Sequence, residues 1–349
     1  SCNNDHVYLA GEQSVIWRTS DDHAFPGVEE SAYSVARHIF DNSMTSLWLG
    51  EYFVPDWDMF RCVEWHAEIH AIARAIAGCP VYISDRADEF KEECHAAQAR
   101  TILSQLAFAD GSILRSRRAG RPTADCIGKN PLEEDVLFKV YNYNNVNGSV
   151  AVFNLRANCS HRVSGYLCAS DVDIFRNHQQ IEQYEYDRQR YVLWNWKSLD
   201  VSRVSSIDEP HRVELRSMTG AMFVVAPIFR TSTENEECAF LGIRGKLNAG
   251  FPILSSTLDK STNQVSAQLG KCEGILTIWH SRGVNGILEC IIQVHDDNKK
   301  TVSDSQRVEY FVGQEGADSG TVDLQLPACR NGGTLLIQLR VNEQVSVLQ

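Results

Sequence analysis

The stretch Trp17-Arg18-Thr19-Ser20-Asp21-Asp22 shows the pattern that decides the fold of this chain. A strand is predicted at residues 14–19, and two acids follow after Ser20. Residues 14–19 have the β-branched and aromatic composition of a strand. Residues 31–48 then carry apolar side chains at helical spacing, namely Val35, Ile39, Met44 and Leu47. A strand, an acidic turn and a helix in this order form the unit from which parallel sheets are built.

The same unit recurs twice in the next part of the chain. A short apolar strand is predicted at residues 50–53, ending at Pro55, and a helix follows over residues 64–77. Residues 80–85 have the composition of a buried strand, and residues 89–106 alternate polar and apolar faces as a helix does. The predicted order is therefore strand, helix, strand, helix, strand, helix.

Acidic side chains follow each of the three predicted strands: Asp21 and Asp22, then Asp56 and Asp58, then Asp85. In a (β/α)8 barrel these positions open onto one face, where catalytic groups collect. We therefore expect the carboxylates to converge. A barrel needs eight strands, and about 130 residues supply only three or four such units. Residues 1–130 are thus predicted to be the C-terminal half of a (β/α)8 TIM barrel.

Residues 131–349 change to short apolar or alternating runs separated by turn residues, which is typical of antiparallel sheet. The turns are predicted at residues 296–298 and 331–333. The sequence predicts an α/β part followed by an all-β part, an antiparallel β-sandwich. Its strands are predicted at residues 136–141, 149–154, 191–196, 212–215, 221–229, 275–280, 286–295, 307–312, 321–326 and 334–341.

The charge and the cysteines narrow the class of protein. The formal net charge of −12 would repel a phosphate backbone or an anionic membrane, so we expect no nucleic-acid and no membrane partner. The apolar stretch at residues 217–229 is too short to cross a bilayer as a helix. The 11 cysteines include no CxxC pair, which favours a reduced, cytoplasmic chain over a zinc module or a disulfide scaffold.

Arg18 and Asp22 suit the cleavage of a glycosidic bond. A carboxylic acid can protonate the leaving oxygen, and an arginine can bind sugar hydroxyl groups through its charged fork. The alternative is that Asp21 and Asp22 cap the helix that follows. The sequence alone leaves both interpretations open.

Asp56 and Asp58 flank Trp57 in the second acidic turn. An indole ring has a flat face that can stack on the apolar side of a pyranose, and the two acids can bind its hydroxyl groups. In the alternative, Trp57 is a packing residue and Asp58 caps a helix.

His66 and His70 share a helix face and raise the hypothesis of a metal site. The metalloprotease pattern needs Glu directly after the first His, and Ala67 stands there instead. We therefore expect a polar or packed helix face and no metal. Cys62 and His66 could form a nucleophile pair, but the sequence offers no third residue to orient them.

Eight ordered segments carry a resemblance to a known family. They are WRTSDD at 17–22, SLWLGE at 46–51, PDWDMF at 55–60, HAIARA at 70–75, PVYISD at 80–85, DGSILR at 110–115, GRPTADC at 120–126 and FKVYN at 138–142. Together they resemble the raffinose synthase and alkaline α-galactosidase group, also called seed imbibition proteins, within glycoside hydrolase family 36. The resemblance is dense up to residue 154 and faint beyond it.

The resemblance implies roles for individual residues. The wider α-galactosidase clan uses a (β/α)8 barrel and two carboxylates with retention of configuration. Its acid/base lies four residues after an arginine at the end of strand six, which makes Asp22 the expected acid/base and Arg18 a ligand of the substrate hydroxyl groups. The other substrate-binding residues expected are Asp21, Asp56, Trp57, Asp58, Asp85 and Cys2, the last lying where strand five would end.

The implied activity is α-galactosyl processing, as raffinose synthase (galactinol–sucrose galactosyltransferase) or α-galactosidase. Raffinose-family sugars, galactinol and sucrose are the expected partners, and no cofactor is expected, because carboxylates need none for this chemistry. Whether water or a sugar accepts the galactosyl group stays open.

The family's nucleophile lies on strand four in a Lys-x-Asp motif, which the sequence from Ser1 onward does not contain. Retaining chemistry needs two carboxyl groups about 5 Å apart. We therefore expect the 349-residue chain to be an incomplete catalytic domain, inactive alone. The alternative is a non-catalytic or degenerate carbohydrate-binding protein that lacks the nucleophile.

Overall fold

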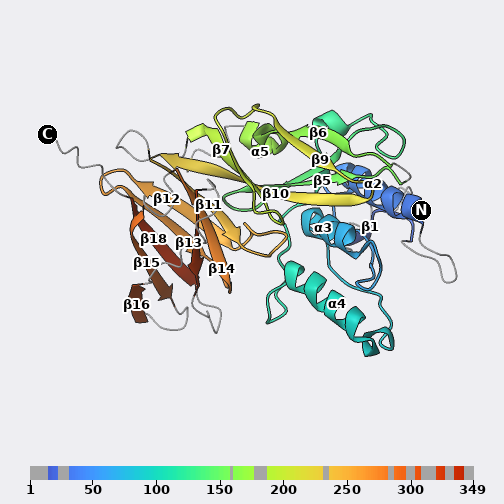
Figure 1. The fold of residues 1–349 in the computed structure, drawn as a ribbon, viewed down its shortest axis with the longest axis horizontal. Helices are drawn as coiled ribbons and strands as arrows, with labels where there is room; N and C mark the ends of the chain where they lie inside the picture. Colours follow the sequence, from blue (N-terminus) through green and yellow to red (C-terminus); the bar gives the residue numbers. More distant parts are fainter. Residues whose placement is uncertain are drawn as a thin grey trace.

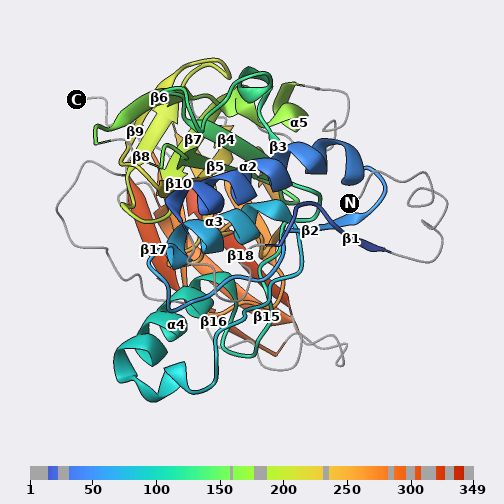
Figure 2. The same cartoon turned by 90° about the vertical axis from the view of Figure 1, so that its right-hand side faces the viewer.

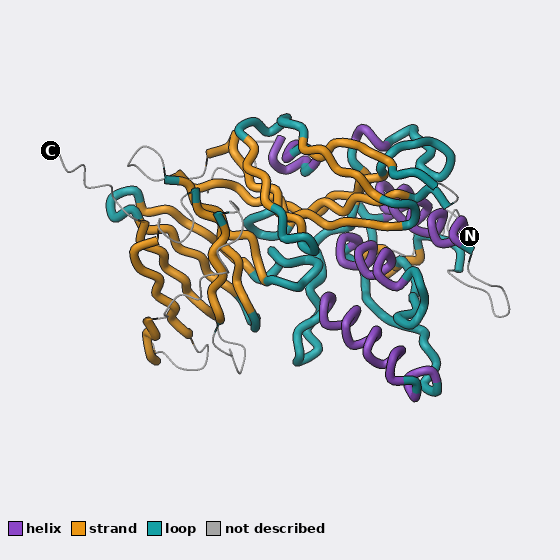
Figure 3. Tube along the Cα trace, viewed as in Figure 1, coloured by secondary structure: helices purple, strands orange, loops and turns teal. Residues whose placement is uncertain are grey.

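The computed structural model describes residues 15–22, 31–157, 160–176, 187–230, 236–281, 287–295, 303–307, 320–326 and 334–341. The longer helices gather at one end of the molecule, and the strands form layers that extend to the other end (Figures 1 and 3). Cys2 and the turns predicted at residues 296–298 and 331–333 lie outside the described residues. No helix within these ranges is long and apolar enough to span a bilayer.

The three predicted helices are present. Ser31 caps the first, because its hydroxyl accepts a hydrogen bond from the backbone N–H of Ser34 at 3.1 Å. Gly78 ends the second with φ of 67°, the left-handed conformation that glycine adopts without strain. The helices are α2 (Ala32–Leu49), α3 (Ala67–Ala77), α4 (Glu93–Leu106) and the short α5 (Asp173–Arg176), with 3₁₀ turns η1 (Glu89–Lys91), η2 (Ala124–Cys126) and η3 (Ala169–Asp171).

The strands follow in chain order. They are β1 (Ile16–Arg18), β2 (Val54–Asp56), β3 (Arg121–Pro122), β4 (Phe138–Tyr143), β5 (Gly148–Asn154), β6 (Val163–Leu167), β7 (Asp187–Asn195), β8 (Val201–Val204), β9 (His211–Leu215), β10 (Thr219–Arg230), β11 (Glu237–Ile243), β12 (Ile253–Asp259), β13 (Gln264–Leu269), β14 (Ile275–His280), β15 (Ile287–His295), β16 (Ser303–Arg307), β17 (Thr321–Gln325) and β18 (Thr334–Val341).

The parallel pairing at the N-terminal end is short. β1 pairs with β2 in parallel, and Arg18 lies opposite Asp56 in the register. The strand predicted at residues 50–53 is wrong. The N–H of Gly50 donates to the carbonyl of Ser46 at 3.0 Å and closes α2, so the strand begins only at Val54.

The strand predicted at residues 80–85 is also wrong. Among the described residues it makes one parallel bridge, from Phe60 to Ile83. The reason lies in the facing chain, where the N–H groups of Cys62 and Val63 donate to the Asp85 carboxylate. Those donors are therefore not available to extend a parallel ladder.

The antiparallel character predicted for the later part of the chain is confirmed. One sheet has the order β17-β14-β11-β10-β5-β4-β3, with β7 also paired to β10 and β8 paired to β7. A second sheet has the order β12-β13-β18-β15-β16. The two sheets share a hydrophobic core, in which Phe240 and Ile278 of the first belong to the same cluster as Val265 and Leu339 of the second.

Several strands depart from the prediction. The strand predicted at residues 307–312 shares only Arg307 with β16, and residues 308–312 lie outside the described part of the chain. The strands β3, β6, β8, β11, β12 and β13 were not predicted, because serine, glutamine and glycine interrupt most of these runs and weaken the alternation.

The helices pack on the larger sheet. In the turned view, α2 and α3 lie in front of the sheet strands (Figure 2). A second core joins Ile39 of α2 and Ile72 of α3 to Phe138 of β4 and Phe153 of β5. This core contains residues from both sides of the boundary predicted at residue 130, which itself stays a prediction.

Glu237 in β11 is an acid held by two arginines. Its side chain is 7% exposed. It accepts hydrogen bonds from Arg203 Nη2, at 2.8 Å, and from Arg190 Nη1. Burial alone would raise the pKa of Glu237, but the two guanidinium groups outweigh burial and lower it.

Glu237→Gln is expected to lower the free energy of unfolding by about 1–3 kcal/mol at neutral pH, because the charged acceptor is lost. The folded-state pKa lies below the unfolded one, so this stabilisation exists above the unfolded pKa and disappears as the pH falls through the folded value. Urea unfolding over a descending pH series measures it. A difference that stays constant with pH would contradict the assignment, and Glu214→Gln, on an exposed ion pair with Arg212, is the control.

Candidate active site

Arg18 lies at the carboxyl end of β1 and contacts two acidic side chains. Its Nη2 lies 3.1 Å from Oδ1 of Asp22, and the guanidinium also forms an ion pair with Asp58. The Asp58 side chain is 2% exposed, whereas that of Asp22 is 59% exposed. Burial alone would lower the pKa of Arg18, but the contact with Asp58 raises it, so the group stays charged. A permanent cation therefore lies between a buried and an open carboxylate.

The turn after β2 has an unusual backbone that presents these acids. Asp58 has φ of 66°, a left-handed conformation that aspartate tolerates better than most residues. Its N–H donates to Oδ1 of Asp56 at 2.9 Å, and its own Oδ1 accepts from the N–H of Met59 at 2.8 Å. The two carboxylates thus accept hydrogen bonds from backbone N–H groups of their own turn. These hydrogen bonds fix the orientation of both side chains.

Arg74 supports this turn from inside the core. It is fully buried in α3, and its Nη2 donates to the carbonyls of Trp57 at 2.7 Å and Met59 at 3.1 Å. Its Nη1 donates to Nδ1 of His70 at 2.7 Å. Burial lowers the pKa of Arg74 to about 10, which still leaves it protonated at neutral pH.

Tyr82 is a site residue that the sequence analysis missed. Its hydroxyl lies 2.7 and 2.9 Å from the two carboxylate oxygens of Asp56 and donates to that group. Burial and the neighbouring Asp56 raise the pKa of Tyr82 well above its ordinary value, so the hydroxyl keeps its proton. The available signal was its place in the apolar segment that ends at Asp85, next to the acids.

Asp85 accepts hydrogen bonds from the backbone N–H groups of Cys62 at 2.9 Å and Val63 at 3.0 Å, one on each oxygen. It therefore fixes the loop after Phe60. Burial, reinforced by Asp85, raises the pKa of the Cys62 thiol to about 12, so the proposed nucleophile pair with His66 is not supported.

Trp57 lies inside the core, with none of its surface exposed, and its Nε1 donates to Oγ of Ser46 at 3.0 Å. The alternative of a packing residue fits this placement, because no face of the ring is open to a sugar. The stacking role expected for Trp57 is not supported by the structure. Asp21, in contrast, is exposed at the end of β1.

His66 and His70 pack edge to face with ring centroids 5.0 Å apart. His70 Nδ1 accepts a hydrogen bond from Arg74, so this ring nitrogen is not available to bind a metal ion. Within the described ranges, no three His, Cys, Asp or Glu side chains form a group that could hold a metal ion.

Comparison with known proteins identifies the family. The family model described as "Raffinose synthase or seed imbibition protein Sip1" matches residues 1–298. The chain is 38% identical over 297 residues to "Probable galactinol--sucrose galactosyltransferase 1" of Arabidopsis thaliana, a match that covers 80% of this chain and 37% of that protein. It is 28% identical over 297 residues to the galactinol–sucrose galactosyltransferase of Pisum sativum, which covers 80% of this chain and 36% of that protein.

A third relative, the stachyose synthase of Pisum sativum, is 24% identical over 270 residues, covering 72% of this chain and 30% of that protein. The chain thus spans between 30% and 37% of the length of these three relatives. The family match extends over most of the chain, well beyond residue 154 where the sequence resemblance became faint. This chain belongs to the raffinose synthase and seed imbibition protein family.

Proposed function

We propose that this chain takes part in the transfer of galactosyl groups between sugars, with retention of configuration and with Asp22 as the acid/base. The observation that carries the proposal is the contact of Arg18 with both Asp22 and Asp58 at the carboxyl end of parallel strands. Asp22 is the open member of this group, so its carboxyl group can reach a bound sugar. General acid–base catalysis needs such an exposed carboxyl group within reach of the leaving oxygen.

The roles proposed for the neighbouring residues follow from their contacts. Arg18 and Asp56 bind sugar hydroxyl groups, because each is partly exposed and keeps hydrogen-bonding capacity. Asp58, buried against Arg18, holds the guanidinium in place. Tyr82 orients the Asp56 carboxylate. Asp22 first protonates the departing oxygen and then accepts the proton of the acceptor hydroxyl.

The same observations support a proposal about architecture. We assign β1, β2 and the bridged segment at Ile83 to strands six, seven and eight of a (β/α)8 barrel, within residues 1–130, with an antiparallel β-sandwich over residues 131–349. The parallel register of β1 with β2 and the parallel bridge from Phe60 to Ile83 support the first assignment. The shared core of the two antiparallel sheets supports the second.

The names of the relatives suggest the substrates. Galactinol is the proposed donor and sucrose the proposed acceptor, because two relatives are named as transferases of this pair. The second carboxylate of the mechanism is expected in a Lys-x-Asp motif, which this sequence does not contain. The test therefore needs a protein that supplies that motif.

A hybrid meets this need: this chain replaces the 297 matched residues of the pea galactinol–sucrose galactosyltransferase. With galactinol and sucrose, chromatography should show a trisaccharide product. Free galactose without trisaccharide would make the activity hydrolytic. No turnover from a hybrid that folds, beside an active pea protein, would contradict the proposal.

A further inference from the structure

Arg74 is a fully buried cation whose hydrogen bonds converge on the acidic turn after β2. Its Nη2 donates to three successive carbonyls, those of Trp57 at 2.7 Å, Asp58 at 3.3 Å and Met59 at 3.1 Å. Three successive carbonyls point to one nitrogen here because the chain turns sharply at Asp58, which has φ of 66°. The contacts of Arg74 therefore depend on the left-handed conformation of Asp58.

The guanidinium group of Arg74 is itself held by two rings. Its Nη1 donates to Nδ1 of His70 at 2.7 Å, and its Cζ lies 5.4 Å from the centre of the Phe60 ring. Within the described ranges, Arg74 forms no ion pair with an Asp or Glu side chain. Burying a charge without such a partner costs more free energy than burying an apolar side chain. What Arg74 adds at this position of α3 is a set of donors for the turn, which an apolar residue could not provide.

The left-handed conformation of Asp58 needs support from its surroundings. A non-glycine residue persists in this conformation only where neighbouring contacts hold it there. Within the turn, the carboxylates of Asp56 and Asp58 accept hydrogen bonds from backbone N–H groups. Arg74 completes this support from α3, because it binds the carbonyls that the turn directs into the core.

The position of Asp58 in turn determines where Arg18 lies. Arg18 forms an ion pair with the buried carboxylate of Asp58, and its Nη2 lies 3.1 Å from Oδ1 of Asp22. A displacement of Asp58 would therefore move the cation that contacts Asp22. A chain of contacts thus connects the buried Arg74 to the exposed Asp22, although Arg74 has no surface that a sugar could reach.

We propose that Arg74 is a positioning residue of the candidate active site, which holds the turn at Asp58 and thereby places Arg18 and Asp22 for the reaction. Its effect on the rate rests on the proposed function, whereas its effect on the turn does not. A misplacement of about 1 Å can lower the rate of an enzyme about 10²-fold. Arg74 is therefore expected to control kcat without touching the substrate.

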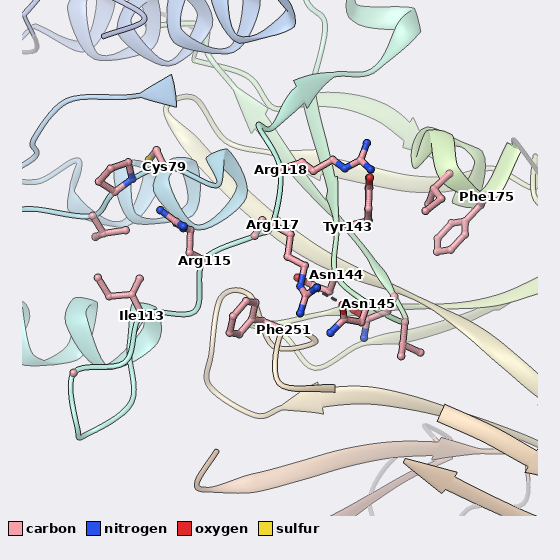
Figure 4. A pocket seen from close by; sticks show the side chains of 17 residues that line it. Cys79, Ile113, Arg115, Arg117, Arg118, Tyr143, Asn144, Asn145, Phe175 and Phe251 are labelled. Atoms are coloured by element: carbon pink, nitrogen blue, oxygen red, sulfur yellow. Dashed lines mark hydrogen bonds between the residues drawn. The ribbon is translucent and has the colours of Figure 1, made fainter. Parts of the chain in front are cut away.

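Asn142 in β4 offers a matched control. It is 2% exposed, and its Nδ2 donates to the carbonyls of Ile76 at 2.8 Å and Arg118 at 2.7 Å. Arg118 lies against Tyr143 at the border of a cavity that none of the acids of the candidate active site lines (Figure 4). Asn142 is thus a buried donor to main-chain carbonyls, as Arg74 is, but its hydrogen bonds go to other segments.

The kinetic test compares folded variants of the hybrid described above. Arg74→Met should lower kcat for trisaccharide formation about 10²-fold. Arg74→Lys keeps the positive charge but has fewer donors, so an intermediate kcat is expected. Asn142→Ala should leave kcat within about twofold of wild type. A kcat of Arg74→Met within about twofold of wild type, or an equal loss in Asn142→Ala, would overturn the proposal.

A double-mutant cycle separates positioning from a general loss of stability. Asp58→Asn removes the charge that holds Arg18, so adding Arg74→Met to it should lower kcat by less than about a further threefold. Two substitutions that act independently multiply their effects. A further loss of about 10²-fold in the Asp58→Asn background would show that Arg74 does not act through Asp58, and the proposal would be wrong.

Crystal structures of the 349-residue chain test the effect on the turn without turnover. In Arg74→Met, Asp58 should leave the left-handed region and lose its contact with Arg18, whereas both should stay in Asn142→Ala. If Arg74→Met does not fold, Arg74→Lys takes its place, because one ammonium group should not hold all three carbonyls. An unchanged turn would contradict the proposal. A wild-type hybrid without turnover would contradict only the proposed function, and these structures would still decide the role of Arg74.

Discussion

Asp22→Asn is expected to lower kcat for galactosyl transfer by about 10²- to 10⁴-fold in the hybrid described above, the usual contribution of a general acid–base residue. Asparagine keeps the shape of the side chain and can still accept a hydrogen bond from Arg18, but it cannot give a proton to the leaving oxygen. The measurement is the initial rate of trisaccharide formation at saturating galactinol and sucrose.

Comparing donors with different leaving groups tests specifically whether Asp22 acts as the general acid. A 4-nitrophenyl α-galactoside needs little protonation of its departing oxygen, so formation of the galactosyl intermediate should lose much less rate in Asp22→Asn than it does with galactinol. Asp41→Asn changes an exposed acid of α2 that pairs with Arg37 and should leave both rates unchanged. An equal loss with both donors would show that Asp22 is not the acid.

Trp57→Ala is expected to lower the free energy of unfolding by about 3–5 kcal/mol, because it removes the largest fully buried side chain of the described chain and leaves a cavity. The variant also leaves Ser46 Oγ without the indole donor. Thermal or urea unfolding of the 349-residue chain measures the change. Trp65→Ala, at a tryptophan that is 57% exposed, is the matched control and should cost less than about 0.5 kcal/mol.

Trp57→Phe separates packing from sugar contact. Phenylalanine refills most of the volume, so the variant should fold and lose about 1–2 kcal/mol with the hydrogen bond to Ser46. If Trp57 only packs, the KM for galactinol in the hybrid should stay within about twofold of wild type. A folded variant with a KM raised tenfold or more would instead place the ring against the sugar.

Local patterns accounted for the helices and for the character of the sheets. The apolar spacing over α2, α3 and α4 identified each helix, because helix formation depends on residues three and four apart. Alternating apolar runs likewise located β4, β5, β10, β14 and β18. The structure also brings together Arg18 and Asp22, two residues that the sequence analysis assigned to one site: Arg18 Nη2 lies 3.1 Å from Oδ1 of Asp22.

Local sequence patterns could not predict the bounds of the short parallel strands next to β1 and β2. Residues 80–85 have the composition of a strand but form one bridge, since a strand exists only where a neighbour offers free backbone donors. The neighbour's donors at Cys62 and Val63 bind Asp85 instead. Composition carries no information about that competition.

The sequence by itself determined that this chain has helices beside antiparallel sheets and that Asp21 and Asp22 follow an apolar strand. Only the tertiary structure decided which acid is open and which is buried: Asp22 is left exposed, and Asp58 is buried against Arg18. It also decided that the Asp85 carboxylate accepts hydrogen bonds from two backbone N–H groups. It also enclosed Trp57 and brought Tyr82 to Asp56. The physical reason is that burial and hydrogen-bond partners come from segments distant in sequence, whereas periodicity reports only on neighbours along the chain.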